Sequence, residues 1–281
     1  MHSDNQSQVA VVKNFCKLKL IVAVCACLMA GMAHSAGAGL RVVSLDNCAD
    51  QYVLGLVPRA DILAVSDRAG LPESYYRYRV GTIRHLRPQL ETILALHPDA
   101  VVRTWGGDER MLMTLKAYGI KELDINDVED FDQAKHELLR IGHALGQDET
   151  ALGEAYRLDQ ALETTRPIGA GKTVLYYTPS GYSEGSDSFV GQMLKTLGFT
   201  VSNPSGFVQP EKLVGETPDV FALGFYDDRY EVSRRAPGRN PLVQAAIAAK
   251  PRLTLPDRAV ACSAWYDAYD LQALSLKGLQ R

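Results

Sequence analysis

The sequence has little of three things: long apolar runs, clustered basic residues and histidine. The apolar segment Leu20–Met32 holds about 13 residues, fewer than the roughly 20 that a membrane-spanning helix needs. The 30 Lys and Arg against 33 Asp and Glu give a net charge of -3, and without a basic run the chain lacks the usual footprint of a nucleic-acid binder. The composition of the 281 residues, 46% hydrophobic and 22% charged, is typical of a globular protein and argues against disorder and a multi-span membrane protein.

The N-terminus is organised like an export signal. Several lysines precede the apolar segment, and small residues follow it at positions 33–38. Residues 33–35 and 36–38 each match the small-x-small pattern of a cleavage site, so we expect a signal peptide over residues 1–36 and a periplasmic protein. A lipoprotein signal ending at Cys27 is the alternative, because residues 24–26 form a partial lipobox.

Cysteine is scarce in the mature part of the chain. Of five cysteines, only Cys48 and Cys262 lie beyond the expected signal peptide. Two thiols in an oxidising compartment can form a disulfide, but the sequence does not show whether their backbones approach closely enough. A disulfide and two separate buried thiols therefore both remain open.

Strand and helix patterns alternate along two parts of the mature chain, residues 40–129 and 171–281. Such alternation predicts parallel sheets covered by helices. The expected strands are residues 40–45, 62–65, 100–102, 122–125, 173–177, 199–201, 220–223 and 258–261. The expected helices are residues 50–56, 90–96, 111–118 and 189–197, with another that begins at Pro210.

Residues 130–166 separate these two parts and contain no proline, with apolar residues at three- and four-residue steps. This spacing predicts one long linking helix, with Gly146 as a potential break. A Pro-Asp step precedes an apolar strand in each half, at Pro98-Asp99 and at Pro218-Asp219. We therefore expect an α/β fold of two Rossmann-like lobes with mainly parallel sheets, joined by one long α-helix.

One motif suggests an enzyme. Residues 181–185 match G-x-S-x-G with Ser183 at the centre, after a strand and before a helix, as in the nucleophile elbow of an α/β-hydrolase. In that chain order the general-base histidine follows the serine, yet no histidine follows His143. A secreted serine hydrolase is kept as an alternative to a binding function, and a glycine-rich loop is the better account.

A bare Zn or Mn site is a second alternative. Such a site between two lobes needs several imidazole or carboxylate ligands, some from each lobe. The second lobe has no histidine, and only His85, in the expected loop 81–85, falls where a cleft would lie. We therefore predict no metal site and no cofactor of the protein's own.

Aromatic residues follow several of the expected strands, where parallel-sheet proteins place their ligands. The set consists of Tyr75, Tyr76, Tyr78, Trp105, Tyr182, Trp265 and Tyr266, and Arg77 and His85 are further predicted ligand contacts. Each ring could instead pack as part of the core. Together they favour a cleft for a bulky, partly planar or anionic small molecule.

The order of these pieces resembles the helical-backbone (class III) periplasmic substrate-binding proteins of iron-siderophore, heme and cobalamin ABC importers. The resemblance rests on the strands 41–45 and 62–66, the Leu-x-Pro-Asp step into Val101-Val102, the segment Ile141-Gly142-x-x-Leu145-Gly146 and the second lobe. Residues 105–110, Trp-Gly-Gly-Asp-Glu-Arg, are most similar to the cobalamin-binding members. The loop 46–48 and a short C-terminal helix depart from the family pattern.

The resemblance implies a function and roles for several residues. Trp105 and Trp265 would lie beside the ligand, and Glu109 and Asp187, with Glu184 as an alternative to Asp187, would meet arginines of an inner-membrane permease. The ligand would be a ferric siderophore, a corrinoid or heme, so that any Fe or Co belongs to the ligand. We expect a monomer that binds without catalysis and whose lobes close only modestly.

Overall fold

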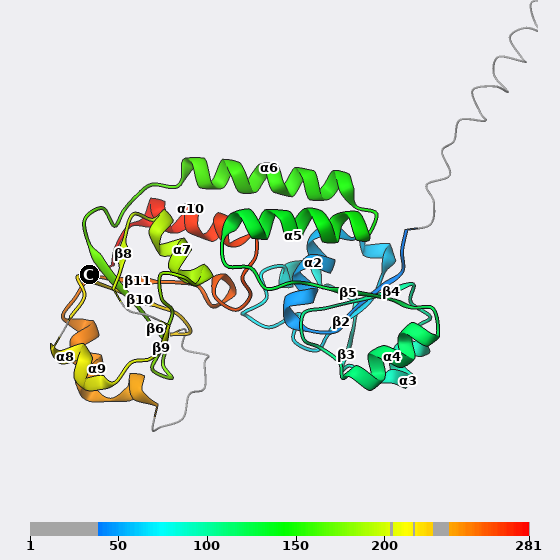
Figure 1. The fold of residues 1–281 in the computed structure, drawn as a ribbon, viewed down its shortest axis with the longest axis horizontal. Helices are drawn as coiled ribbons and strands as arrows, with labels where there is room; N and C mark the ends of the chain where they lie inside the picture. Colours follow the sequence, from blue (N-terminus) through cyan, green and yellow to red (C-terminus); the bar gives the residue numbers. More distant parts are fainter. Residues whose placement is uncertain (1–38, 203–204, 216, 227–235, 281) are drawn as a thin grey trace, which may run out of the picture. The chain divides into compact units, whose positions relative to one another are not determined.

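Two parallel β-sheets, one from each half of the chain, form the centres of two lobes within the unit that begins at Leu40 (Figure 1). The computed structural model describes residues 39–202, 205–215, 217–226 and 236–280. The expected signal peptide, residues 1–36, lies outside the described residues. Within the described ranges, no helix has the length and apolar character that crossing a membrane requires.

The N-terminal lobe has a five-stranded sheet in the order β3-β2-β1-β4-β5, and every pair in it is parallel. Its strands are β1 (Val42–Ser44), β2 (Ile62–Ser66), β3 (Arg84–Leu86), β4 (Ala100–Arg103) and β5 (Lys121–Asp124). Its helices are α2 (Asn47–Leu56), α3 (Leu90–Leu94) and α4 (Glu109–Ala117), with 3-10 turns η1 (Arg59–Asp61) and η2 (Arg77–Arg79). The central strand β1 is buried throughout, as expected for a sheet covered on both faces.

The C-terminal lobe has a four-stranded parallel sheet in the order β11-β10-β6-β8 and a separate antiparallel pair, β7 and β9. Its strands are β6 (Thr173–Tyr177), β7 (Tyr182–Ser183), β8 (Thr200–Val201), β9 (Gly206–Phe207), β10 (Val220–Leu223) and β11 (Arg252–Thr254). Its helices are α7 (Phe189–Thr196), α8 (Pro210–Gly215), α9 (Pro241–Ala248) and α10 (Asp267–Lys277), with η3 (Pro237–Arg239) and η4 (Asp257–Ala259). The predicted α/β class with two parallel-sheet lobes is confirmed.

The aspartate of each Pro-Asp step makes the same kind of hydrogen bond in both lobes. The Asp99 carboxylate, just before β4, accepts a hydrogen bond of 2.7 Å from the backbone N–H of Arg41, just before β1. Asp219, just before β10, accepts one of 2.8 Å from the N–H of Thr173, the first residue of β6. Each aspartate thus fixes the start of the strand that pairs with its own.

The single linking helix predicted over residues 130–166 is wrong. The segment forms two helices, α5 (Phe131–Ala144) and α6 (Asp148–Thr164), that lie side by side as a hairpin (Figure 1). Gly146 ends the first helix with φ 70°, a conformation that favours glycine, and a Cβ on Gly142 would lie 2.3 Å from that of Ala151. The two glycines therefore allow the turn and the close packing, and α6 alone leads into the second lobe.

The strand predicted over residues 258–261 is also wrong. The strand that pairs with β10 is β11, six residues earlier than predicted, and the N–H of Leu255 continues the pairing with the Leu223 carbonyl at 2.8 Å. Pro256 then ends the strand, because it has no N–H to donate. The guanidinium of Arg258 instead donates to the Asp270 carboxylate of α10 at 3.0 Å and 2.5 Å.

Candidate ligand-binding site

A cavity of about 590 Å³ lies between the two lobes and is called the cleft below. The first lobe lines it with α2 and with the loops that follow β4 and β5. The second lobe lines it with the segment between β7 and α7 and with residues 261–263. The loops of the first lobe leave the carboxyl ends of its strands, where open α/β sheets bind their ligands.

Trp105 lies in the cleft on a loop that the Asp46 carboxylate holds in place. Oδ2 of Asp46 accepts hydrogen bonds from the backbone N–H groups of Thr104, Trp105 and Gly106, at 2.8, 3.2 and 2.9 Å. A Cβ on Gly106 would lie 2.7 Å from the Leu45 carbonyl oxygen, so a glycine is needed for this close approach. The Trp105 side chain is 59% exposed although its backbone is fixed, which suits a ring that contacts a ligand.

Two residues that line the cleft carry buried hydroxyl groups with no hydrogen-bond partner among the described residues. The hydroxyls belong to Tyr52, which is 2% exposed, and to Thr104. Burial raises the pKa of the Tyr52 phenol, and the nearby Glu137 and Asp267 raise it further. Tyr52 is therefore a neutral group that can donate a hydrogen bond to a ligand.

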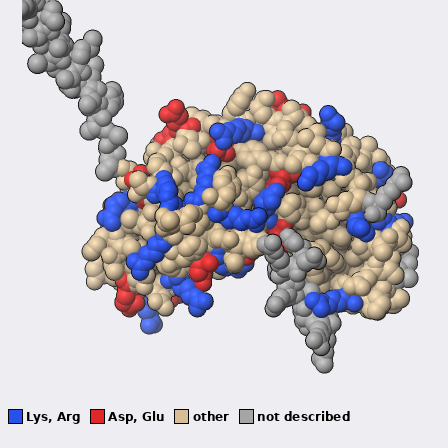
Figure 2. Space-filling view, turned by 180° about the vertical axis from the view of Figure 1, so that it is seen from behind, with Lys and Arg blue, Asp and Glu red and all other residues tan. Residues whose placement is uncertain are grey.

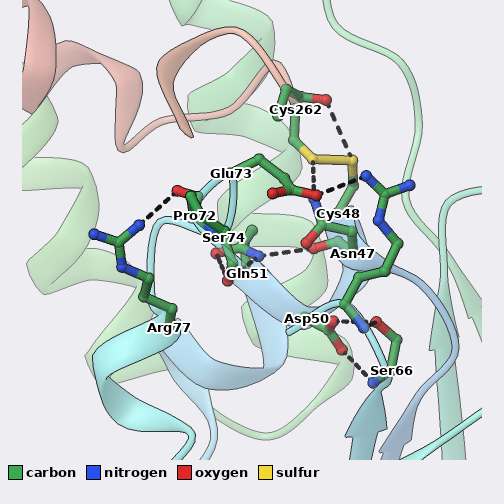
Figure 3. A network of polar contacts seen from close by, with 12 residues as sticks. Asn47, Cys48, Asp50, Gln51, Ser66, Pro72, Glu73, Ser74, Arg77 and Cys262 are labelled. Carbon is green, nitrogen blue, oxygen red and sulfur yellow. Dashed lines mark hydrogen bonds and ion pairs between the residues drawn. A yellow bond between two sulfur atoms is a disulfide. The ribbon is translucent and has the colours of Figure 1, made fainter. Parts of the chain in front are cut away.

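Cys48 and Cys262 form a disulfide that joins α2 of the first lobe to the segment before α10 of the second (Figure 3). Their Cα atoms are 5.5 Å apart, and both residues line the cleft. The bridge resolves the alternative that the sequence left open. Because it spans 214 residues of sequence, it stabilises the fold by about 4 kcal/mol, chiefly by restricting the unfolded chain.

A buried polar network fixes the other side of α2 (Figure 3). The Gln51 side chain donates to Ser74 Oγ at 2.9 Å and accepts from the Tyr76 N–H at 2.9 Å. Asp50 accepts from the N–H and the hydroxyl of Ser66, at 2.9 and 2.6 Å. Burial raises the pKa of Asp50 to about 6, although the bonds from Ser66 lower it.

The prediction that Tyr76, Trp265 and Tyr266 line the ligand cleft conflicts with their burial. Their exposed fractions are 2%, 0% and 1%. The three side chains belong instead to a cluster of packed rings at the junction between the lobes. This junction cluster comprises Tyr75, Tyr76, Glu154, Trp265, Tyr266 and Tyr269. For these rings, packing as core is the correct interpretation.

Glu154 of α6 is the polar centre of the junction cluster. Its carboxylate accepts hydrogen bonds from Trp265 Nε1 at 3.3 Å, from the Tyr269 hydroxyl at 2.8 Å and from Arg157 at 2.7 Å. Tyr75 stacks on Tyr266 with ring centroids 4.6 Å apart. Tyr75 and Tyr76 also line a second pocket of about 440 Å³, between α6 and α10, which is separate from the cleft.

Three other predicted ligand residues lie outside the lining of the cleft. Arg77 is exposed in η2 and donates to the Pro72 carbonyl at 2.8 Å (Figure 3). His85 lies in the edge strand β3, not in a loop, and is exposed. Tyr182 lies in β7 and packs edge-on against Phe207, with centroids 5.4 Å apart.

The acidic residues expected to meet a permease lie on different lobes. Glu109 is the first residue of α4, directly after the N-cap Asp108, and is exposed. Asp187 is exposed just before α7, and both Asp187 and Glu184 line the cleft.

Among the described residues, the structure offers no suitable site for either alternative function. Ser183 is 0% exposed, lies in an antiparallel pair rather than on a strand-to-helix turn, and its hydroxyl has no partner among the described residues. It therefore lacks the exposure and the general base of a nucleophile. For a bare metal ion, the part of the chain that the structure describes contains no group of three or more His, Cys, Asp or Glu side chains that could hold it.

The sequence interpretation missed Asp46, Tyr52, Asp127 and Glu129. Asp127 and Glu129 follow β5 directly and line the cleft. The aromatic residues were selected because they follow parallel strands. The same rule also selects these two carboxylates. Nothing in the local pattern marks Tyr52, which lies within an apolar helix.

The fold is shared with solved periplasmic binding proteins. No protein-family model and no curated protein matches the sequence. HutB of Vibrio cholerae, a periplasmic heme-binding protein, matches with a TM-score of 0.68 and 17% identity over 85% of this chain and 98% of that chain. The apo form of RhuT from Roseiflexus sp. RS-1, another periplasmic heme-binding protein, gives 0.67 and 17% over 85% and 97%.

A structure with a different ligand matches as well. CeuE of Helicobacter pylori with Ni(II) bound gives a TM-score of 0.60 and 15% identity over 85% of this chain and 83% of that chain. The fold expected from the sequence resemblance is thereby confirmed. The chain has the two-lobed fold of the periplasmic binding proteins.

Proposed function

We propose that the protein is the periplasmic binding component of an ABC importer and that it carries a metal chelate without changing it chemically. The observation that carries this proposal is the cleft between the lobes, with the exposed Trp105 ring on a loop fixed by Asp46. A volume of about 590 Å³ is within the range of small-molecule sites, roughly 300–1,000 Å³. An exposed indole that faces a cavity offers a stacking surface for a ring-rich ligand.

The ligand class is a ferric siderophore, a corrinoid or heme. Solved proteins of the same fold that are described as binding heme or Ni(II) support a metal-containing ligand. Among the predicted aromatic residues, Trp105 is retained as the ligand contact. Trp265 and Tyr266 are assigned to holding the lobes together.

The lobes close little when the ligand binds. Three structures connect them: helix α6, the junction cluster and the disulfide from Cys48 to Cys262. Motion of one lobe against the other would strain the disulfide or separate packed rings. We therefore expect small local adjustments of the cleft loops rather than a wide hinge motion.

Export and delivery complete the proposed role. Residues 1–36 direct export and are removed, and the mature chain acts as a monomer. Glu109 on one lobe and Asp187 on the other recognise arginines of the permease. Paired charges of this kind speed and orient docking without a large apolar interface.

The experiment is isothermal titration of the protein that lacks residues 1–36 with ferric siderophores, heme and cyanocobalamin. We expect one class to bind with micromolar or tighter affinity and to be recovered unchanged. Absence of binding by all three classes would overturn the proposed function. For docking, reversing the charge of Glu109, which lies outside the lining of the cleft, is expected to reduce uptake by the reconstituted importer while leaving the titration unchanged.

A further inference from the structure

The described lining of the cleft is acidic and contains no basic side chain. Asp127 and Glu129 line it from the first lobe, and Glu184 and Asp187 line it from the second. No Lys, Arg or His is among the described residues that line this cavity. Within the described part of the chain, none of these four carboxylates forms an ion pair.

This negative charge is local to the cleft. The whole chain carries a net charge of only -3. On the face drawn in Figure 2, Lys and Arg side chains gather in a band, with Asp and Glu among them. The carboxylates of the cleft are therefore not part of a uniformly acidic surface.

The surroundings make these carboxylates effective against a charged ligand. Glu184 is half-buried, and Asp187, also in the lining, is exposed. Charges at the wall of a cavity with low-dielectric surroundings act more strongly on a ligand than the same charges in open water. An anionic ligand would bring like charges together, whereas a cation would be attracted.

Two residues of the lining also carry uncharged hydrogen-bonding groups. The buried hydroxyls of Tyr52 and Thr104 have no partner among the described residues, and both residues line the cavity. A buried unpartnered hydroxyl costs free energy that a ligand oxygen can recover. A ligand carboxylate, by contrast, is usually held by an arginine fork, which the described lining lacks.

We infer, on the basis of the proposed function, that the ligand is a neutral or positively charged metal chelate and that the Tyr52 hydroxyl donates a hydrogen bond to one of its uncharged oxygens. Suitable chemistry is a ferric hydroxamate or an amide-substituted corrinoid. Ferric catecholates, with their several negative charges, and heme, with two propionates, bind weakly. This inference narrows the sequence-based expectation of a bulky, partly planar or anionic ligand to one without net negative charge.

The test uses ligands that share a scaffold and differ in charge. Ferrioxamine B is a cation through its free amine, its N-acetyl derivative is neutral and its N-succinyl derivative is an anion. Cyanocobalamin and its monocarboxylic acid derivative form a second pair. We expect affinity to fall by about tenfold for each unit of negative charge added, in whichever scaffold binds.

Two variants locate the effect. The fourfold variant D127N/E129Q/E184Q/D187N is expected to lose this charge dependence, whereas the control E149Q/E163Q, on the exposed face of α6, retains it. Tyr52→Phe keeps the ring and removes the unpartnered hydroxyl. It is expected to weaken binding of the neutral ligand about fivefold while leaving the melting temperature unchanged or slightly higher.

The outcomes separate this inference from the proposed function. If heme or a ferric catecholate binds and the neutral and cationic chelates do not, the charge inference fails and the proposed function stands. If no chelate of any charge binds, both fail. If affinity falls with charge but Tyr52→Phe binds normally, the assignment of the tyrosine is overturned.

Discussion

The lobe junction has two sides, and they differ in how fully their polar groups are bonded. In the junction cluster, the Glu154 carboxylate accepts hydrogen bonds from three side chains, and the residue is buried. In the cleft, the hydroxyls of Tyr52 and Thr104 have no partner among the described residues, and Trp105 is exposed. Polar groups whose hydrogen bonds are all made stabilise the fold, whereas buried polar groups without a partner beside a cavity are free to bond to a ligand. From this difference we infer that the junction cluster stabilises the fold and that the cleft binds the ligand.

The largest expected effect is on the junction cluster. Trp265→Ala removes a fully buried ring and leaves the Glu154 carboxylate with one donor fewer, so the free energy of unfolding should fall by about 5 kcal/mol. Denaturant unfolding measures this change. Trp105→Ala is the matched control, because that ring is exposed and its loss should alter stability by less than about 0.5 kcal/mol. Equal losses in the two variants would contradict the division between the two sides.

The disulfide lies in the lining of the cleft, but we expect its removal to change the free energy of unfolding. Cys48→Ser combined with Cys262→Ser should lower the free energy of unfolding by about 4 kcal/mol, because the unfolded chain regains freedom over a long loop. Thermal unfolding of the wild type with and without a reductant should show the same difference. A melting temperature that is unaffected by reduction would show that the bridge does not form in the protein.

Helix α2 contributes to both sides, and Asp50 within it gives a test that depends on pH. Because burial raises its pKa from 3.8 to about 6, the folded protein holds the Asp50 proton more tightly than the unfolded chain does. Stability from this group is therefore present at low pH and declines as pH rises from about 4 to about 6, by about 3 kcal/mol in total.

Asp50→Asn removes that titration, and its amide can still bond to Ser66. The difference in unfolding free energy, wild type minus variant, should therefore fall by about 2.5 kcal/mol between pH 4 and pH 7. Other titrating groups cancel in this difference. A difference that does not change with pH would show that the pKa of Asp50 is not raised, because the carboxylate is hydrated in the folded protein.

Much of the fold could be predicted from local patterns. The buried strands are short, mostly apolar runs, and a Pro-Asp step marks the start of one strand in each lobe. The hairpin of α5 and α6 was harder, because Gly146 permits a turn but only the packing of Gly142 against Ala151 shows that the chain reverses. A helical period alone is compatible with a straight helix and with two packed ones.

The site was predicted less well, for a physical reason. Trp105 could be found because its strand was recognised, and the ligand-side loop follows directly from that strand. Trp265 was placed in the cleft because the strand before it was misplaced. Its true partner, Glu154, lies 111 residues away on α6, and no local pattern reports a contact over that distance.

The most direct test of the central claim is the affinity of the Trp105→Ala variant for the chelate that the wild type binds. Isothermal titration should show about tenfold weaker binding, because the indole loses its stacking contact, while the unfolding free energy stays the same. Equal affinities in the variant and the wild type would contradict a chelate held against Trp105 in the cleft.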